Sequence, residues 1–208
     1  MAKETFERWT SKAFRLPEYI LSLDHSDPLL SEYDIPCAII NDNKNAVQAI
    51  NKGAEHATGD ILIVVSDDFD CPRNWDLKLL EVIDERHDFV LRIKDGLQNY
   101  LVTMPIMDRV YYERFGYIYY PEYQHMFCDT ELTCVAELLG KLISCNLPFP
   151  HNHYSSTGKK DQVSMKADQT WEQGEGLFRS RVKRNFDLIN PKGRITDKVM
   201  LNWIKRNG

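Results

Sequence analysis

The sequence predicts an α/β fold in which helices flank a central, mostly parallel, Rossmann-like sheet. The first observation is the run from Asp60 to Ser66, where five aliphatic residues between polar ends indicate a strand buried on both faces. The second is the alternation of such short apolar runs with segments of helical spacing. Strands buried on both faces lie in the interior of parallel sheets, so we expect this one near the centre.

The first sixty residues alternate helix and strand patterns. Apolar residues at helical spacing predict a helix over 2–15, which Pro17 ends. Short apolar runs next to turn-forming residues predict strands over 19–23 and 37–40. A helix over 45–56 follows, and one of its faces carries small residues that can lie close to a sheet.

Further along the chain the same patterns continue. They predict a helix over 75–85 and strands over 89–93 and 101–107. A segment over 111–123 that holds six tyrosines precedes a helix predicted over 130–142. The basic, amphipathic stretch from Trp171 to Trp203 predicts one or two helices that pack on the edge of the domain.

Composition narrows the class of protein. A chain of 208 residues with 43% apolar content can bury the core of one domain. Its net charge of −5 and pI near 5.7 argue against a general nucleic-acid binder, so we expect no nucleic-acid partner. Five cysteines without a CxxC pair suit a reducing compartment. With no apolar run near the ~20 residues of a membrane helix and no apolar signal core, we expect a soluble, cytoplasmic protein.

Three carboxylates follow the predicted central strand within four residues: Asp67, Asp68 and Asp70. Ligands of open α/β sheets bind beyond the carboxyl ends of the strands. Carboxylates this close repel one another unless a cation or hydrogen-bond donors offset the charge, and such oxygen ligands favour Mg²⁺ or Mn²⁺. The pattern predicts a metal and diphosphate site; the alternative is a solvated turn with capping aspartates.

The letters around this motif form a longer pattern over residues 41–80. It consists of Asn51-Lys-Gly, Ala57-Thr-Gly-Asp, the apolar strand with Asp67-Asp68, and Pro72 with Trp75. This pattern resembles the N-x-G, A-x-G-D, D-x-D and P-x-x-W run of inverting family 2 glycosyltransferases with the GT-A fold. The resemblance implies a Mn²⁺- or Mg²⁺-dependent transfer of a sugar, with inversion, from a uridine-linked nucleotide diphosphate sugar to a glycan or other hydroxyl acceptor.

The resemblance also divides the chain and assigns the donor side. It implies a GT-A-like domain over 1–170, with a nucleotide-sugar half over about 1–95 and an acceptor half over about 96–170, and a C-terminal helical extension over 171–208. Asp67 and Asp68 match the family's acidic pair, while Asp70 is either a third ligand or part of the rim. The nucleotide-binding residues that the resemblance implies are Asp24, Asn51, Lys52, Gly53 and Asp67. The alternatives are a turn residue for Asp24 and close helix packing for Gly53.

On the acceptor side, Asp129 and Glu131 open the helix predicted over 130–142. By resemblance, Asp129 is the base that takes the proton of the attacking hydroxyl, and the alternative is a helix N-cap. Glu131 is the second candidate for the base, or it complements the helix dipole. The loop histidines His153 and, second, His151 resemble the histidine that completes the metal shell in related transferases.

Two further features concern the acceptor and a membrane. Tyr119 and Tyr120 lie in the tyrosine-rich segment and offer stacking surfaces for an acceptor sugar, together with Glu131 and His151, although such tyrosines are more often core. Basic residues after Trp171 favour either a solvated helix surface or peripheral contact with an anionic membrane.

The sequence departs from the family at its start. Members begin with an apolar strand and a Thr/Arg/Pro-containing turn, whereas this sequence opens on what resembles the following helix. The resemblance therefore implies two strands with unpaired edges unless another segment or chain fills the gap. A sugar nucleotidyltransferase and an inactive nucleotide- or glycan-binding relic are the alternative functions, and oligomeric state is open.

Overall fold

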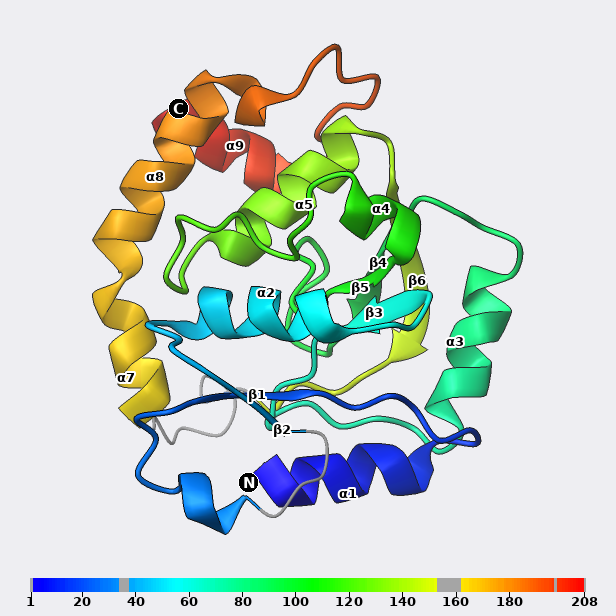
Figure 1. Cartoon of the computed structure of the whole chain (residues 1–208). Helices are drawn as coiled ribbons and strands as arrows, with labels where there is room; N and C mark the ends of the chain where they lie inside the picture. The colour runs from blue at the N-terminus through cyan, green and yellow to red at the C-terminus, as the bar shows by residue number, and fades with distance from the viewer. Residues whose placement is uncertain (1, 34–37, 153–161, 197, 208) are drawn as a thin grey trace.

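The computed structural model describes residues 2–33, 38–152, 162–196 and 198–207 (Figure 1). Its strands are β1 (Leu21–Asp24), β2 (Ala38–Asn41), β3 (Ile61–Ile63), β4 (Val90–Lys94), β5 (Ile106–Asp108) and β6 (Leu142–Pro148). Its helices are α1 (Ala2–Lys12), α2 (Ala46–His56), α3 (Trp75–Ile83), α4 (Arg109–Glu113), α5 (Cys128–Leu138), α7 (Gln162–Gln169), α8 (Trp171–Lys183) and α9 (Lys198–Asn207), with 3₁₀ turns η1 (Leu30–Glu32) and η2 (Asn185–Asp187). The predicted α/β class is confirmed.

The strands form two sheets. One contains β1 and β2, which are parallel; the other has the order β3-β5-β4-β6. In the larger sheet β5 is antiparallel to β3 and β4, while β4 and β6 are parallel. The sheet is therefore mixed, because the chain returns from β4 to β5 without a crossover helix.

Both faces of the larger sheet are buried, and neighbouring residues on its strands point into different cores. On β4, Val90 belongs to the core under α2, α5 and α8, and Leu91 belongs to the core under α1 and α3. Met107 and Ile106 of β5 divide in the same way. This two-residue alternation is what a pleated strand covered by helices on both faces requires. In Figure 1, α1 lies at one end of the molecule and α5, α8 and α9 lie at the other.

The strand expected near the centre of the sheet lies at an edge instead. Only Ile61–Ile63 form β3, which pairs with β5 on one side. Among the described residues no strand pairs with its other side, since β1 and β2 belong to the separate sheet. Within the described residues β1 and β3 are thus edge strands, as are β2 and β6. Unpaired edges at two strands were what the departure from the family implied.

The helix predicted over 130–142 ends at Leu138 in the structure, and the last predicted residue, Leu142, starts β6, a strand that the sequence patterns did not predict. Gly140 has φ +67°, a left-handed conformation that favours glycine. Around it, the amide of Gly140 donates to Glu137 O at 2.9 Å and the amide of Lys141 donates to Ala136 O at 2.8 Å. This pair of bonds is a Schellman motif, which ends α5 and directs the chain into β6.

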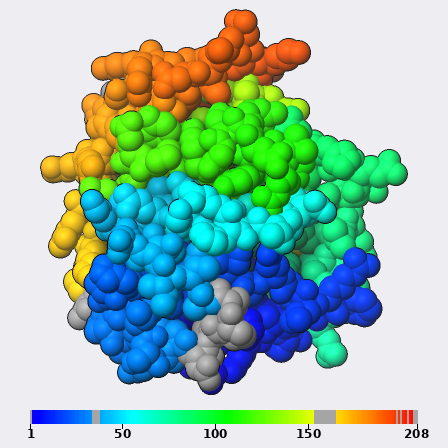
Figure 2. Space-filling model, viewed as in Figure 1, coloured from blue at the N-terminus to red at the C-terminus, as the bar shows by residue number. Residues whose placement is uncertain are grey.

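The C-terminal helices are part of the main body. Phe178 of α8 is fully buried in the core that α5 also lines. Gly174 allows the close approach, because a Cβ atom there would lie 2.4 Å from Met126 O. In the space-filling view of Figure 2 the C-terminal residues, in orange, cover one end of the molecule and the N-terminal residues, in blue, cover the other.

Candidate active site

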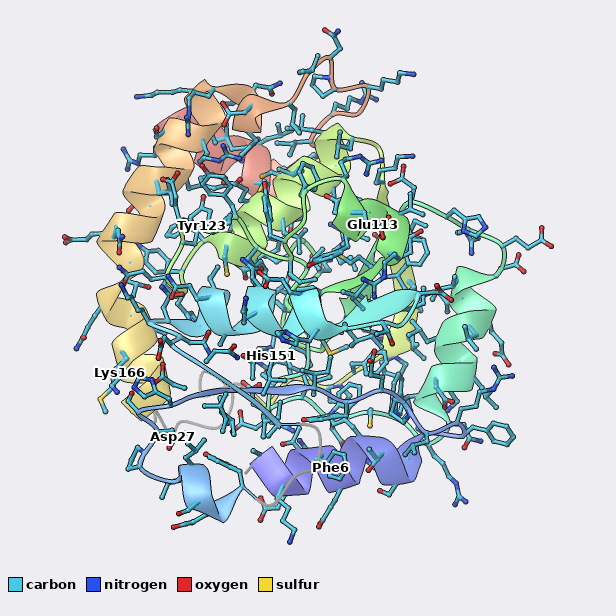
Figure 3. All side chains as sticks on the ribbon, viewed as in Figure 1. Phe6, Asp27, Glu113, Tyr123, His151 and Lys166 are labelled. Atoms are coloured by element: carbon cyan, nitrogen blue, oxygen red, sulfur yellow. The ribbon has the colours of Figure 1, made fainter. Side chains whose placement is uncertain are left out.

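The turn after β3 that contains Asp67, Asp68 and Asp70, called the acidic turn below, is hydrogen-bonded to the segment that follows β6. The amide of Asp70 donates to Pro150 O at 2.9 Å, and the amide of Asn152 donates to Asp68 O at 2.8 Å. The rings of Phe69 and His151 stack with centroids 4.1 Å apart. These contacts make a short antiparallel bridge and bring two turns far apart in the sequence together. His151 is labelled near the middle of the molecule in Figure 3.

Asp68 and His151 are in direct contact within this turn. Nε2 of His151 lies 2.9 Å from Oδ2 of Asp68, and the side chains are 13% and 34% exposed. The hydroxyl of Ser66 donates to the other oxygen of Asp68. Burial acts to raise the pKa of Asp68, but the hydrogen bonds with His151 and Ser66 outweigh it and hold the pKa below its usual range. Asp68 is therefore an ionised carboxylate.

Asp70 faces away from this pair. Its Oδ1 lies 2.6 Å from Nζ of Lys12 and accepts from the amide of Cys71 at 2.8 Å. Burial acts to raise the pKa of Asp70, and the hydrogen bond with Lys12 outweighs it, so the pKa is lowered. Asp67 is exposed, and its backbone oxygen accepts from the guanidinium of Arg8 at 2.8 Å. Lys12 and Arg8 therefore bind α1 to the acidic turn.

The residues present fit a divalent cation only in part. Asp68 offers a carboxylate oxygen, the ligand type that Mn²⁺ and Mg²⁺ prefer, and His151 beside it offers an imidazole nitrogen. Among the described residues no group of three His, Cys, Asp or Glu side chains converges to hold an ion. The predicted ligand His153 lies outside the described residues. His151, predicted second to it and on the acceptor side, is the histidine beside the acidic turn.

The four predicted nucleotide-binding residues outside the acidic turn have local partners. Asp24 is the last residue of β1 and accepts from the amide of Ser26 at 2.7 Å and from its hydroxyl, and these bonds lower its pKa. This is the turn geometry that the sequence left as an alternative. Gly53 of α2 lies over β1, where a Cβ atom would lie 3.7 Å from Ser22 Cβ, an ordinary van der Waals contact. Close packing therefore does not by itself require glycine at this position.

The side chains of Asn51 and Lys52 each bond to other residues of the protein, and the two sets of residues differ. The side-chain oxygen of Asn51 accepts from the amides of Ile118 and Tyr119 at 3.0 Å, and its nitrogen donates to Tyr119 O at 2.8 Å. Asn51 therefore fixes the tyrosine-rich segment to α2. Lys52 is on the surface and pairs with Glu55 at 2.6 Å.

Asp129 lies in the first turn of α5, not at its N-cap. The N-cap is Phe127, whose φ of +71° starts the helix without a side-chain cap. Asp129 Oδ1 accepts from the amide of the next residue, Thr130, at 2.7 Å and not from an amide further along. Burial raises the pKa of Asp129 and outweighs the hydrogen bonds from Thr130. Asp129 is half-buried and keeps an accessible surface, as a proton acceptor needs.

Glu131, two residues further on, is in a different environment. It is 3% exposed, and its Oε1 lies 2.7 Å from a guanidinium nitrogen of Arg181 in α8. The hydroxyl of Tyr123 donates to its Oε2 at 2.8 Å; Tyr123 is labelled near α8 in Figure 3. Burial raises the pKa of Glu131 against the opposing effect of Arg181. Its carboxylate is occupied by structural partners, which leaves Asp129 as the accessible carboxylate of the two.

Sequence patterns did not reveal Arg181. Its place among the basic residues after Trp171 predicts a surface position, whereas Arg181 is only 3% exposed. Its guanidinium donates to Glu131 and lies 3.7 Å from the ring centroid of Tyr120. An arginine on the apolar stripe of an amphipathic helix is the signal that points to a buried partner. Tyr119 is 6% exposed in the core, and Tyr120 lies under Arg181. Both rings are therefore engaged by the protein itself.

No described helix combines the length and the apolar character that crossing a bilayer requires.

Comparison with known proteins gave one match. The chain matches the family model "Glycosyl transferase family 2" over residues 20–137. Comparisons with curated proteins and with solved structures found no match. The family match starts at the lead-in to β1, contains the acidic turn and ends within α5. Because it spans more than half of the chain, the chain belongs to glycosyl transferase family 2 and is a glycosyltransferase.

Proposed function

We propose that this glycosyltransferase moves a sugar, with inversion, from a uridine-linked nucleotide diphosphate sugar to a glycan or other hydroxyl acceptor, and that it depends on Mn²⁺ or Mg²⁺. The observation that carries the proposal is the ionised carboxylate of Asp68, held against His151 beyond the end of β3. It lies where α/β sheets bind their ligands and inside the family match.

The donor side rests on the turn after β3. Asp68, with Asp67 and His151, would hold the cation, which supplies positive charge to offset the charge that develops on the departing diphosphate. Asp70 is a weaker candidate, because Lys12 and Arg8 already balance its charge. The two cations of α1 instead keep the acidic turn in place.

The acceptor side rests on Asp129. In this step the acceptor oxygen attacks the anomeric carbon and forms the new C–O bond, while the bond from that carbon to the phosphate oxygen breaks and the nucleotide diphosphate leaves with the electron pair. Asp129 takes the acceptor's proton. Its raised pKa makes it a stronger base than an ordinary aspartate, which supports this role.

The same experiment distinguishes two alternative functions. A sugar nucleotidyltransferase draws no support from the family match. An inactive relic that binds nucleotide or glycan keeps the donor site and loses transfer. Binding and turnover therefore have to be measured separately.

The test is a thermal-shift panel of nucleoside diphosphates with and without Mn²⁺, followed by a donor-hydrolysis and transfer assay. We expect UDP to raise the Tm only when Mn²⁺ is present, and Asp68→Asn to abolish that rise. The matched control is Asp84→Asn, which changes an exposed carboxylate at the C-cap of α3, away from the acidic turn. No Tm rise with any diphosphate would refute the donor assignment, and Mn²⁺-dependent binding without turnover would identify the relic.

The site of action in this proposal is the cytoplasm. The four described cysteines Cys71, Cys128, Cys134 and Cys145 are free thiols, as a reducing compartment favours. Peripheral membrane contact would use the exposed basic residues Lys183, Arg184 and Lys192. Flotation with anionic and with neutral vesicles tests that contact.

A further inference from the structure

The chain leaves β4 through a buried aspartate. Asp95 follows β4 directly and is 2% exposed, a rare position for a carboxylate. One of its oxygens accepts from the amides of Leu97 and Gln98 at 2.8 and 3.1 Å. The other accepts from the side-chain nitrogen of Gln98 at 3.0 Å and from the hydroxyl of Thr103 at 2.8 Å. Four hydrogen bonds therefore fold residues 95–103 around a carboxylate that lies outside both the acidic turn and α5.

Gln98 fixes the next part of this segment. Its side-chain oxygen accepts from the amides of Tyr100 and Leu101, both at 2.6 Å, and its nitrogen donates to Leu101 O at 3.2 Å. The guanidinium of Arg92, on β4, donates to Tyr100 O at 3.3 Å. A buried polar network whose members are bonded in this way makes a segment rigid. We call residues 95–105, between β4 and β5, the β4–β5 loop.

The start of the β4–β5 loop is bonded to the segment that carries His151. The amide of His151 donates to Asp95 O at 2.9 Å, and the amide of Phe149 donates to Lys94 O at 3.0 Å. The imidazole of the same histidine lies 2.9 Å from Asp68. The loop therefore helps to set the position of His151 beside the acidic turn.

The later part of the β4–β5 loop is bonded to α5. The amide of Val102 donates to the hydroxyl of Thr133 at 2.9 Å, and that hydroxyl donates to Asp129 O at 2.7 Å. Val102 and Thr133 are fully buried, so water does not compete for these bonds. One hydroxyl thus joins the loop to the backbone of the proposed base, and the same loop contacts both sides of the proposed site.

We propose that the β4–β5 loop fixes the distance between His151 on the donor side and Asp129 on the acceptor side, with Asp95 and Thr133 as positioning residues. The inference rests on the proposed function, in which one side holds the cation and the other takes the proton. Transfer needs the acceptor oxygen aligned with the anomeric carbon, and a misplacement of about 1 Å can cost about 10²-fold in rate. A rigid connection between the two sides keeps that alignment.

The first variant removes the hydroxyl that joins the loop to α5. Thr133→Val replaces it by a methyl group, so both of its bonds are lost. We expect kcat for transfer to fall by about 10- to 100-fold, while the KM for the donor and the Tm rise with UDP and Mn²⁺ stay as in the wild type. Thr133→Ser keeps the hydroxyl and should restore transfer. The matched control is Thr10→Val, which loses a hydroxyl bond to Phe6 O within α1 and should leave kcat unchanged.

A second variant tests the other end of the loop. Asp95→Asn turns one acceptor oxygen into a donor that faces N–H or O–H groups, and it should lower kcat in the same way. If both variants break one connection, the double variant should be no slower than the slower single variant. Fold-losses that multiply in the double variant would overturn the proposal. So would a wild-type kcat in Thr133→Val, or an equal loss of kcat in Thr10→Val.

Hydrogen exchange provides a readout that does not need transfer. In Thr133→Val the amides of Val102 and His151 should both exchange at least about tenfold faster than in the wild type, although only Val102 bonds the lost hydroxyl. Faster exchange at Val102 alone would show that the loop does not connect the two sides and would refute the proposal. If the wild type transfers no sugar, the proposed function fails, and these two amides alone decide whether the loop joins His151 to α5.

Discussion

The region of β1, β3 and the turn with Asp67 and Asp68 differs from the region of α5 and α8 in how its charged and polar groups are placed. In the first, Asp67 is exposed, Asp68 is one-third exposed, and two strand edges face a cavity. In the second, Glu131 and Arg181 are each 3% exposed and bond to one another. The comparison suggests that accessible groups serve ligands and buried groups serve stability, and α5 contains one carboxylate of each kind.

The largest expected effect is on activity and tests the accessible carboxylate of α5. Asp129→Asn should lower transfer by about 10²- to 10⁴-fold, the range for a lost general base, with donor binding retained. Because the pKa of Asp129 is raised, transfer by the wild type should increase as the pH rises through that pKa and the carboxylate ionises. Initial rates against pH measure both. A variant that still transfers at the wild-type rate would show that Asp129 has only a structural role.

Next in size is the buried pair. Arg181→Ala leaves Glu131 buried without its counter-charge, so the free energy of unfolding should fall by about 3–5 kcal/mol. The matched control on α8 is Arg179→Ala, whose pair with Glu175 is partly exposed and should cost about 0.3–0.5 kcal/mol. Urea denaturation followed by circular dichroism compares the two. Equal losses would contradict the contrast between buried and accessible charge.

A smaller effect tests how closely α8 packs. Gly174→Ala places a Cβ atom 2.4 Å from Met126 O, and such overpacking costs about 1–3 kcal/mol. Gly176→Ala, two residues later, meets nothing within 4 Å and should stabilise the helix by up to about 1 kcal/mol. Opposite signs for the two substitutions in a denaturation series would confirm that α8 is docked as described.

The smallest effect concerns the accessible pair after β3. The pKa of Asp68 is lowered in the folded chain, so its contribution to stability is present above the pKa of the unfolded carboxyl and is lost as the pH falls through the folded value. Since the side chain is one-third exposed, Asp68→Asn should cost about 1 kcal/mol or less at pH 7. The difference in Tm from the wild type should vanish in acid; a difference that grows there would reverse the sign assigned to this pair.

Periodicity in the sequence was sufficient to predict several helices and strands, and the acidic motif was found because it follows one of those strands. The predicted helix over 45–56 corresponds to α2, and the predicted strand over 89–93 corresponds to β4, because their signals lie within a few residues. The contacts that define the site join distant residues: 83 positions separate Asp68 from His151, and 50 separate Glu131 from Arg181. Local spacing carries no information about such pairs. β6 escaped prediction for a related reason, since a single left-handed glycine decides where α5 ends.

The ion pair between α5 and α8 also sets an order of events during synthesis. Arg181 leaves the ribosome well after Glu131, and chains generally begin to fold from the N-terminus while they are made. Until α8 arrives, Glu131 has to stay in water or take up a proton, so α5 cannot settle fully with Asp129 in its final place. The helix that bears the proposed base is therefore among the last parts of the protein to mature.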